Sequence, residues 1–574
     1  MKTLKQLCTP RSSVFDKTKR DIVLDLTDLA QDKIKPAEFF EENYLTDGMK
    51  RLFRETFRRF AGKSEQGVFK LTQAMGGGKT HNLIALGLLA KHPEIRAQVL
   101  SDIPEVEDVA AVRVVAFSGR ESDVPFGIWG AIADQLGKKD FFKDYYAPLS
   151  APGQTAWVNL LQGEPLLILL DELPPYFQAA RAKQIGNSDL SEVTTTALAN
   201  LLVAVGKGEL GNVCVVISDL RASYAEGTEQ VQRALLNLEH ELGRTALNLE
   251  PVGLNTDEIY HILRKRIFKD LPAESEIKEV AMEYARAIKE ANQMEITTAT
   301  PEKFSQQIML SYPFHPAIKD LYARFRENQN FQQTRGLIRL MRTIAANLFS
   351  TNGKADQIHL IGAHDLDLND RDTLVEITQI NPTLENAISH DVAALGKAVA
   401  ETMDANLKGT DTRDVCKLLL VSSLANVPNA LQGLSYPEII SFLCAPGRNL
   451  ARLNQEILRP LSTSAWYLHV NTEGKLYFKN VQNIVAKLKT TAESYAYNPE
   501  IPRKELRKQL EQMFEPQVKD CYQEVQLLPS LDEVEINRDR VTLIIYEPNP
   551  GGGLHRDLQK FYDEIGRASC RERV

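Results

Sequence analysis

A glycine-rich turn between an apolar strand and a helix is the feature that most constrains how this chain folds. The segment VFKLTQ (68–73) is followed by AMGGGKT and then by HNLIALGLLA, which predicts a strand, a turn and a helix. The backbone N–H groups of such a turn form a nest for anions, and the helix N-terminus adds the positive end of its dipole. The pattern therefore predicts a phosphate-binding loop in an α/β domain.

The side chains of this loop have separate expected roles. Lys79 is expected to reach the β- and γ-phosphates of ATP, and the Thr80 hydroxyl is expected to ligate Mg²⁺. The three glycines allow positive φ and let the backbone approach the phosphates without a Cβ clash. The residues expected to contact the nucleotide are Ala74, Met75, Gly76, Gly77, Gly78, Lys79, Thr80 and His81.

Two positions of the loop leave alternatives open. Gln73 occupies the place of the first glycine in G-x-x-x-x-G-K-[ST], so the turn begins there or later, at Ala74 or Gly76. His81 follows the threonine on the first helical turn, where packing is an alternative to chemistry, and we assign it none. The competing interpretation of the whole segment is a glycine-rich turn that merely precedes Lys-Thr.

A second apolar run ends in two carboxylates. LLILL (166–170) is followed by Asp171 and Glu172. In P-loop ATPases an aspartate at this point helps to hold Mg²⁺ through its water shell, and a glutamate polarises the attacking water. A buried strand that ends in a solvated Asp-Glu pair is common by itself. Its position after a phosphate loop favours a role in ATP hydrolysis.

Short apolar runs alternate with helical patterns between residues 67 and 251. Each run is nearly continuous, as expected for parallel strands covered on both faces. The runs cover 68–73, 112–117, 166–170, 213–217 and 245–250, and the helices cover 80–92, 125–136, 192–206 and 228–242. This alternation predicts an α/β three-layer core, preceded by a helical lead-in over residues 1–66 that packs against it.

The remainder of the chain has a helical pattern. Residues 255–350 contain helices only, which predicts a helical lid over 252–355. Helices at 411–425, 436–444 and 448–463, followed by a hairpin at 466–480, predict a winged-helix-like module within 356–500. Its third helix and wing carry the basic residues Arg448, Arg452, Arg459, Lys475 and Lys479. DNA binding and protein packing both remain open for this module, and we favour packing or protein contact.

The C-terminal residues predict the start of another domain. A charged helix at 502–526 leads to VTLIIYEP (541–548), which is expected to be the first strand of a domain that begins at 501. Residues 564–574, EIGRASCRERV, match the translation of a sequencing adapter. We therefore expect the natural chain to continue past Asp563.

Composition excludes several classes of protein. The formal net charge is -8, so the whole chain is not a polycation that coats nucleic acid. No run reaches the roughly 18 apolar residues of a membrane span, and the N-terminus has no apolar signal core. The six cysteines are scattered without a C-x-x-C pair, which fits free thiols in a reducing cytosol and a cytoplasmic protein.

The sequence resembles a family of large prokaryotic AAA-type ATPases catalogued as domain of unknown function 499. The resemblance rests on NYLTDGMKRLFRETFRRFAG, GGGKTHNLIALGLL, LLILLDEL, LEPVGLNTDEIYHILRKRIF, SYPFHPAIKDLYARF and TRGLIRLM, and it covers roughly residues 10–350. It implies a P-loop NTPase core of the AAA-type, additional-strand class with a helical lid. Such proteins tend to be encoded beside DNA methyltransferases and helicases in phage-defence regions, which implies a defence role with such partners.

There are three further candidate residues, Ser218 from its place at a strand end and two arginines from the AAA-type resemblance. Ser218, at the end of VCVVI, is placed to orient water or sense the γ-phosphate, or is an ordinary strand-end hydroxyl. Arg244 corresponds to the arginine that acts on a neighbouring subunit's γ-phosphate, which implies a homo-oligomer; the alternative is a surface arginine at a helix end. Arg335 lies where the lid carries a second sensor, with Arg339 as its competitor, and either could belong to a solvated face.

Two functions follow from these patterns. The first is an AAA-type ATPase that couples ATP hydrolysis to conformational work on a protein or DNA partner. The second is a nucleotide-dependent switch or scaffold that hydrolyses slowly and recruits partners.

Overall fold

The computed structural model describes most of the chain in two compact units, residues 1–482 and 483–574. The described residues are 1–16, 24–72, 77–103, 109–218, 229–250, 257–293, 299–328, 330–498, 500–515, 520–534 and 539–571. The predicted nucleotide contacts Ala74, Met75 and Gly76, and the alternative loop start at Gln73, lie outside these ranges.

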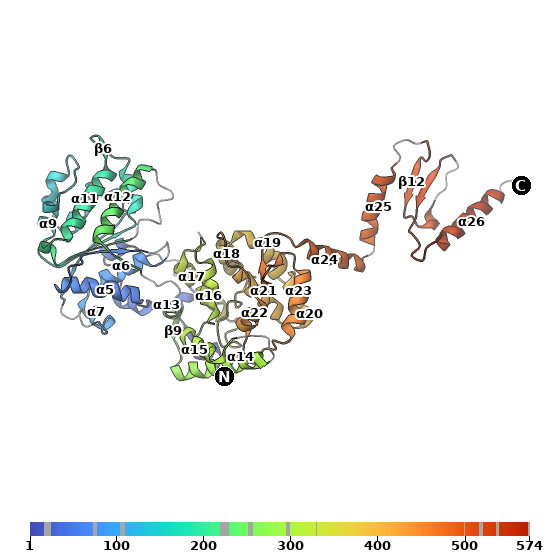
Figure 1. Ribbon diagram of the computed structural model, residues 1–574, viewed down its shortest axis with the longest axis horizontal. Coiled ribbons are helices and arrows are strands. Elements are labelled where there is room, and N and C mark those ends of the chain that lie inside the picture. The colour runs from blue at the N-terminus through green and yellow to red at the C-terminus, as the bar shows by residue number, and fades with distance from the viewer. Residues whose placement is uncertain are drawn as a thin grey trace. The chain divides into compact units, whose positions relative to one another are not determined.

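The first unit contains a five-stranded parallel sheet (Figure 1). Its strands are β2 (Val68–Leu71), β3 (Arg113–Ser118), β4 (Leu166–Asp171), β7 (Val213–Ser218) and β8 (Leu247–Leu249). The spatial order is β3-β4-β7-β2-β8, and every neighbouring pair is parallel. Strand β7 therefore lies between the phosphate-loop strand β2 and the acidic strand β4, as in additional-strand P-loop NTPases. The five predicted strands are confirmed.

Helices cover both faces of this sheet, which gives three layers (Figure 1). All six residues of β4 are buried, with Ile168 and Leu170 in one hydrophobic cluster and Leu167 and Leu169 in another. One face is covered by α3 (Leu26–Ala30), α4 (Pro36–Glu42), α5 (Asp47–Phe60), α6 (Lys79–Lys91) and α7 (Pro93–Val99). The other is covered by α8 (Gly127–Gln135), α9 (Gln154–Leu161), α10 (Leu173–Ala180), α11 (Leu190–Val205) and α12 (Glu229–Thr245). A short hairpin, β5 (Gln184–Ile185) and β6 (Ser188–Asp189), precedes α11.

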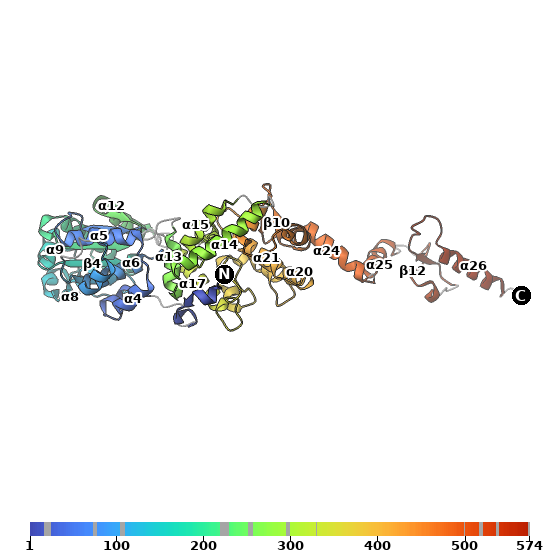
Figure 2. The same ribbon diagram turned by 90° about the horizontal axis from the view of Figure 1, so that it is seen from below.

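A helical part follows the sheet along the chain, and the first residues of the chain belong to it (Figure 2). Strand β1 (Thr9–Pro10) pairs antiparallel with β9 (Phe268–Asp270), and the Leu4 backbone N–H donates to the Ile358 carbonyl at 2.8 Å. Two predictions are therefore corrected. The helices-only pattern of 255–350 is interrupted by β9, and residues 1–14 of the lead-in pack into the helical part. A three-residue strand paired with the distant N-terminus leaves no local periodicity.

One hydrophobic cluster holds the helical part together from Leu4 to Phe478. The predicted boundary after residue 355 lies inside this cluster, because Ile344 on one side and Ile377 on the other are both buried in it. Its helices are α1 (Leu4–Leu7), α13 (Glu258–Ile267), α14 (Glu274–Gln293), α15 (Pro301–Ser311), α16 (Ala317–Phe325), α17 (Gln333–Leu348), α18 (Arg371–Ile380), α19 (Glu385–Ala387), α20 (Val399–Leu407), α21 (Asp411–Ser422), α22 (Tyr436–Leu443) and α23 (Arg459–Ser464).

Helices and a hairpin occupy the region predicted as a winged-helix-like module. The hairpin consists of β10 (Leu468–Val470) and β11 (Leu476–Phe478), and Leu434 forms an antiparallel bridge to Leu476. Helices α21 and α22 agree with the predicted ranges. The third helix is shorter than predicted, because a π-helical segment at Leu453–Leu458 precedes α23.

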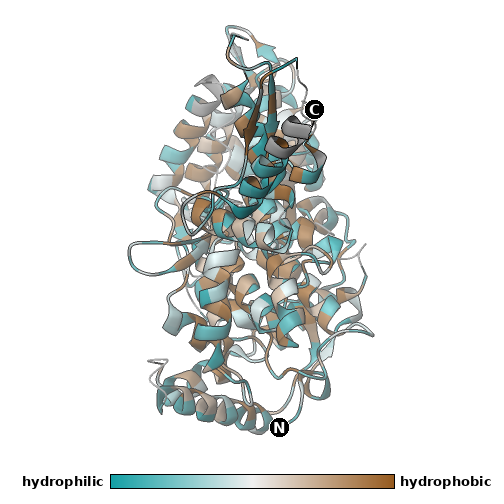
Figure 3. Cartoon of the chain, turned by 90° about the vertical axis from the view of Figure 1, so that its right-hand side faces the viewer, coloured by the Kyte–Doolittle hydropathy of each residue, from teal (hydrophilic) through white to brown (hydrophobic). Residues whose placement is uncertain are grey.

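The second unit contains helices and a two-stranded parallel sheet. Its elements are α24 (Ile484–Tyr497), α25 (Glu500–Phe514), β12 (Glu524–Leu527), β13 (Thr542–Ile545) and α26 (Arg556–Arg571). The predicted helix 502–526 therefore ends early, and the predicted first strand 541–548 pairs with the earlier strand β12. Teal and brown residues are interspersed along the helices in Figure 3, and no helix among the described residues is long and apolar enough to cross a bilayer.

Candidate functional site

The last glycine of the predicted phosphate loop lies at the start of α6. Gly78 is the N-cap of α6 with φ 89° and ψ 14°, a left-handed conformation that side-chain-bearing residues rarely adopt. Its carbonyl accepts the Asn82 backbone N–H at 3.0 Å and the Asn82 side-chain amide at 2.8 Å. Lys79 and Thr80 consequently form the first turn of α6, at the positive end of the helix dipole.

Thr80 and Asp171 meet at the carboxyl edge of the sheet. The Thr80 hydroxyl donates to Asp171 Oδ2 at 2.5 Å. Asp171 is only 3% exposed, and this burial raises the pKa of its carboxyl, while hydrogen bonds from Ser218 and Thr80 act in the opposite direction. The structure thus brings together the two residues predicted to hold Mg²⁺.

Ser218 connects the ends of β7 and β4. Strand β7 lies between β2 and β4, and Ser218 is the register partner of Leu71, the last residue of β2. The Glu172 backbone N–H donates to Ser218 Oγ at 3.3 Å and to Asp171 Oδ1 at 3.0 Å. The predicted candidates Thr80, Asp171, Glu172 and Ser218 therefore form one hydrogen-bonded group.

Glu172 is bound by a residue that sequence reasoning missed. Its carboxylate forms an ion pair with the Arg120 guanidinium, through Nε and through Nη2 at 3.4 Å from Oε1. The carboxylate raises the pKa of Arg120 by hydrogen bonding and charge. Glu172 itself adopts a left-handed conformation, φ 48° and ψ 41°, at the N-cap of α10. The side chain expected to polarise water is therefore paired with a cation.

The sheet order explains why Arg120 reaches Glu172. Strand β3 is the neighbour of β4, and Gly119 follows it with its backbone N–H 2.8 Å from the Asp171 carbonyl. A Cβ on Gly119 would lie 2.0 Å from the Glu172 carbonyl oxygen, so only glycine allows this close approach. The sequence signal was a basic residue just after the strand that precedes the acidic one.

We expect Arg120→Ala to raise the basal ATP turnover about 1.4-fold to fivefold, because an exposed ion pair stabilises by ~0.2–1 kcal/mol. Release from the guanidinium leaves the Glu172 carboxylate available to water. Steady-state phosphate release measures this effect. Arg113→Ala is the matched control, since Arg113 forms an exposed ion pair with Glu164 at the opposite end of β3, 2.8 Å apart. A lower rate in Arg120→Ala would instead mean that Arg120 assists the reaction.

His81 faces protein groups. Its ring stacks on Phe39 with centroids 4.6 Å apart, and its Nε2 lies 2.5 Å from Asn43 Oδ1 and 3.1 Å from the Arg266 guanidinium. Burial and the charge of Arg266 lower the pKa of His81 well below its usual value. The packing interpretation is therefore favoured over the predicted nucleotide contact.

Arg244 lies at the other edge of the sheet. It lies in the last turn of α12, just before β8, whereas the phosphate loop follows the opposite, carboxyl end of the parallel strand β2. Four strand residues separate these edges by about 13 Å. The side chain is 74% exposed, with one ion pair to Glu241 at 3.2 Å. This position suits action on a neighbouring subunit and not on its own site, so the role in trans remains a prediction.

The two lid arginines differ in their surroundings. Arg339 pairs with Glu376 at 2.6 Å and with Gln379 at 3.2 Å, which joins α17 to α18. Arg335 is exposed on the first turn of α17. Arg339 therefore has a structural partner, and Arg335 stays the predicted second sensor.

The basic residues of the predicted winged-helix-like module are largely paired. Arg448 contacts Asp411 at 2.8 Å and Asp414 at 2.9 Å, and Arg452 lies 3.4 Å from Glu456. In the hairpin, Lys475 pairs with Glu473 at 3.1 Å, while Arg459 and Lys479 are exposed. Neutralised cations contribute little to binding phosphates, so this surface favours the protein-contact alternative over DNA.

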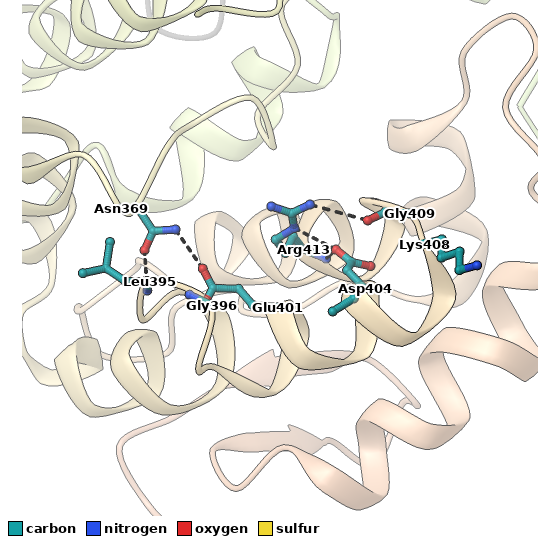
Figure 4. Close-up of a pocket in the computed structure, with 9 residues that line it drawn as sticks. Asn369, Leu395, Gly396, Glu401, Asp404, Lys408, Gly409 and Arg413 are labelled. Carbon is teal, nitrogen blue, oxygen red and sulfur yellow. Dashed lines mark hydrogen bonds and ion pairs between the residues drawn. The ribbon is translucent and has the colours of Figure 1, made fainter.

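A separate hollow of about 500 Å³ lies in the helical part beside α20 (Figure 4). Asp404 accepts the backbone N–H groups of Thr412 and Arg413. Glu401 accepts the Gly396 N–H at 2.8 Å and the Asn369 amide at 2.7 Å. These carboxylates serve as loop and helix caps.

The sequence comparisons identify the family. The DUF499 N-terminal domain matches residues 15–115 and 121–246, and the DUF499 second domain matches residues 254–420. The chain belongs to the DUF499 family. The first match contains Thr80, Asp171, Glu172 and Ser218, while Arg120 falls in its gap at 116–120. The second contains α13 and most of the helical part. No curated protein matches the chain.

Two solved structures are similar to this DUF499 chain at low identity. The Aeropyrum pernix ORC1 protein in complex with DNA has 14% identity and a TM-score of 0.29, covering 86% of this chain and 98% of that chain. Drosophila ORC bound to DNA has 11% identity and a TM-score of 0.29, covering 82% and 93%. The α/β P-loop NTPase fold of the DUF499 chain is established by its own strand order and Gly78 cap.

Proposed function

We propose that this chain is a Mg²⁺-dependent AAA-type ATPase that couples ATP hydrolysis to conformational work on a protein or DNA partner. The observation that carries the proposal is the hydrogen-bonded group at the carboxyl edge of the sheet. Thr80, from the loop helix, donates to Asp171, and Glu172 follows directly with its backbone N–H on Ser218. A phosphate loop alone supports binding, while an adjacent exposed glutamate also supports hydrolysis.

The residues present suit a magnesium ion bound with nucleotide. Thr80 Oγ1 and Asp171 Oδ2 are oxygen atoms 2.5 Å apart, and Mg²⁺ prefers oxygen ligands. The described residues contain no group of three His, Cys, Asp or Glu side chains that could hold a metal alone. Such a pair fits an ion that takes its remaining ligands from phosphate and water. When bound, the ion would neutralise charge on the phosphates.

The chain's own residues would then act by position and charge. The N–H groups at the start of α6 and the Lys79 ammonium would bind and orient the phosphates. Glu172 would polarise a water for in-line attack on the γ-phosphate, with Ser218 as an orienting hydroxyl. Arg244 of one subunit would stabilise the charge developing in a neighbour's site.

Turnover at several protein concentrations tests this function. A motor is expected to hydrolyse ATP at about 1 s⁻¹ or faster. Its rate per chain is expected to rise with concentration if Arg244 acts in trans, and Arg244→Ala should remove this rise. A slow, concentration-independent rate would support the second candidate, a nucleotide-dependent switch or scaffold that recruits partners.

Arg286→Ala is the matched control for this experiment. Arg286 is also an exposed arginine paired with a glutamate one turn earlier, Glu283, at 3.0 Å. Loss of an ion pair of this kind alone should leave turnover and its concentration dependence unchanged.

Membership in DUF499 supports the remaining parts of the proposal. We place the protein in the cytoplasm, in a prokaryotic defence system with a methyltransferase or helicase as partner. We further propose that residues 411–480 form a winged-helix-like module, supported by the hairpin β10–β11 and the Leu434–Leu476 bridge. Its paired arginines support docking to a protein.

A further inference from the structure

Residues 39–47, here called the connector, contact the phosphate-loop helix α6. The connector runs from the end of α4 into the start of α5. The Phe39 ring stacks on His81 with centroids 4.6 Å apart, and Asn43 Oδ1 lies 2.5 Å from His81 Nε2. His81 directly follows Thr80. A shift in the first turn of α6 would therefore reach the connector without any intermediate side chain.

The connector also contacts α13, the first helix of the helical part. The Tyr44 ring stacks on His261 with centroids 4.9 Å apart and an interplanar angle of 15°. The Asp47 backbone N–H donates to the Glu258 carboxylate at 2.6 Å. The connector therefore contacts both α6 and α13.

Arg11, in the N-terminal segment, also contacts the place where the connector meets α13, which is called the junction below. Its Nε donates to the Lys265 carbonyl at 2.8 Å, and its Nη1 lies 3.0 Å from Glu41 Oε1. The Arg11 side chain is only 10% exposed. The end of α13 and the end of α4 are therefore held by one guanidinium.

Arg266 completes the link, because it reaches His81 from α13 itself. Its Nη2 lies 3.1 Å from the His81 Nε2 that also faces Asn43 Oδ1. The orientation of the Asn43 amide is set by its Nδ2, which donates to the Phe39 carbonyl at 2.5 Å. Since a guanidinium only donates and the Asn43 oxygen only accepts, one ring nitrogen cannot bond to both at once. The junction consequently has two alternative hydrogen-bonded arrangements.

We propose that Arg266 is a positioning residue that, through His81 and the connector, makes the state of α13 depend on nucleotide at the phosphate loop. This inference rests on the proposed ATP site and adds the route by which that site acts on the helical part. His81 Nε2 would exchange one of its two hydrogen-bond partners, Asn43 or Arg266, for the other when the first turn of α6 binds phosphate. The hydrogen bond from Arg266 to His81 Nε2 would then form or break, and the stability of α13 would change with it.

Hydrogen exchange of the full chain tests the route, with and without a non-hydrolysable ATP analogue and Mg²⁺. In the wild-type chain, nucleotide is expected to change amide exchange about tenfold in both α6 and α13. Arg266→Met should keep the change in α6 and lose it in α13, while Arg266→Lys, which keeps a donor, should recover part of it. Arg286→Met, which replaces an exposed arginine of α14, is the control and should respond as the wild type does.

The outcomes separate this inference from the proposed function. Two outcomes would overturn the route without contradicting the ATP site. The wild-type chain could respond in α6 and not in α13, or Arg266→Met could retain the full response in α13. No response in α6 would overturn both. If thermal unfolding shows that Arg266→Met does not fold, Tyr44→Leu tests the same route through the stacking on His261. It should weaken the α13 response, and an unchanged response would count against the connector.

Discussion

The Glu172→Gln protein is expected to bind ATP with nearly wild-type affinity and to hydrolyse it about 10²–10⁴-fold more slowly. The change replaces one carboxylate oxygen by an amide group of the same shape, so packing around the strand end is retained. Binding depends on the loop and on Thr80 and Asp171, which the substitution leaves in place. The negative charge that polarises water is lost, and with it the ion pair to Arg120.

Single-turnover phosphate release and equilibrium binding of a fluorescent ATP analogue measure the two quantities separately. The double variant Arg120→Ala, Glu172→Gln supplies a further check, because removal of Arg120 should no longer raise turnover once its carboxylate partner is an amide. Hydrolysis by Glu172→Gln at the wild-type rate would refute the role assigned to this glutamate.

The sheet and its loop could be predicted because their signals are local. Strands buried on both faces are continuous apolar runs, and LLILL in β4 has this form along its whole length. The expected roles of Thr80 and Asp171 were inferred from residue type and from their order along the chain. Their hydrogen bond shows that order along the chain translates here into contact.

Arg120 could not be assigned because its partner is set by which strands are neighbours. A basic residue after β3 becomes meaningful only once β3 is known to lie beside β4. The contacts of His81 could not be predicted for the same reason. Asn43 precedes His81 in the sequence and Arg266 follows it far along the chain. Such long-range contacts between single polar side chains leave no periodic pattern.

Errors at element ends also have local causes. The predicted helix at 448–463 begins in α-helical form only at Arg459, after the π-helical segment Leu453–Leu458. In the second unit, the residues after Phe514 carry a mixed polar pattern that continued the helical prediction, yet 524–527 form a strand with β13. Residues 524–527 form a strand because they pair with β13, which lies farther along the chain.

Lys79→Ala is expected to weaken ATP binding by roughly 30-fold to several thousand-fold, as loss of one partner from a charge-assisted contact costs about 2–5 kcal/mol. The lysine starts α6, where its ammonium adds a full charge to the positive end of the helix dipole. Isothermal titration with ATP and Mg²⁺ measures the loss. Turnover should fall with it, because unbound nucleotide is not hydrolysed.

The control for this prediction lies on the same helix. Lys91, at the other end of α6, is about 18 Å away along the axis and pairs with Asp32 at 2.6 Å. Lys91→Ala also removes a cation from α6. If the loss of affinity in Lys79→Ala depends on the place of the charge beside the phosphates and not on net charge, Lys91→Ala should leave ATP affinity within about twofold of the wild type. Equal losses in both variants would mean that ATP responds to overall charge. Retained affinity in Lys79→Ala would contradict a phosphate site at this loop.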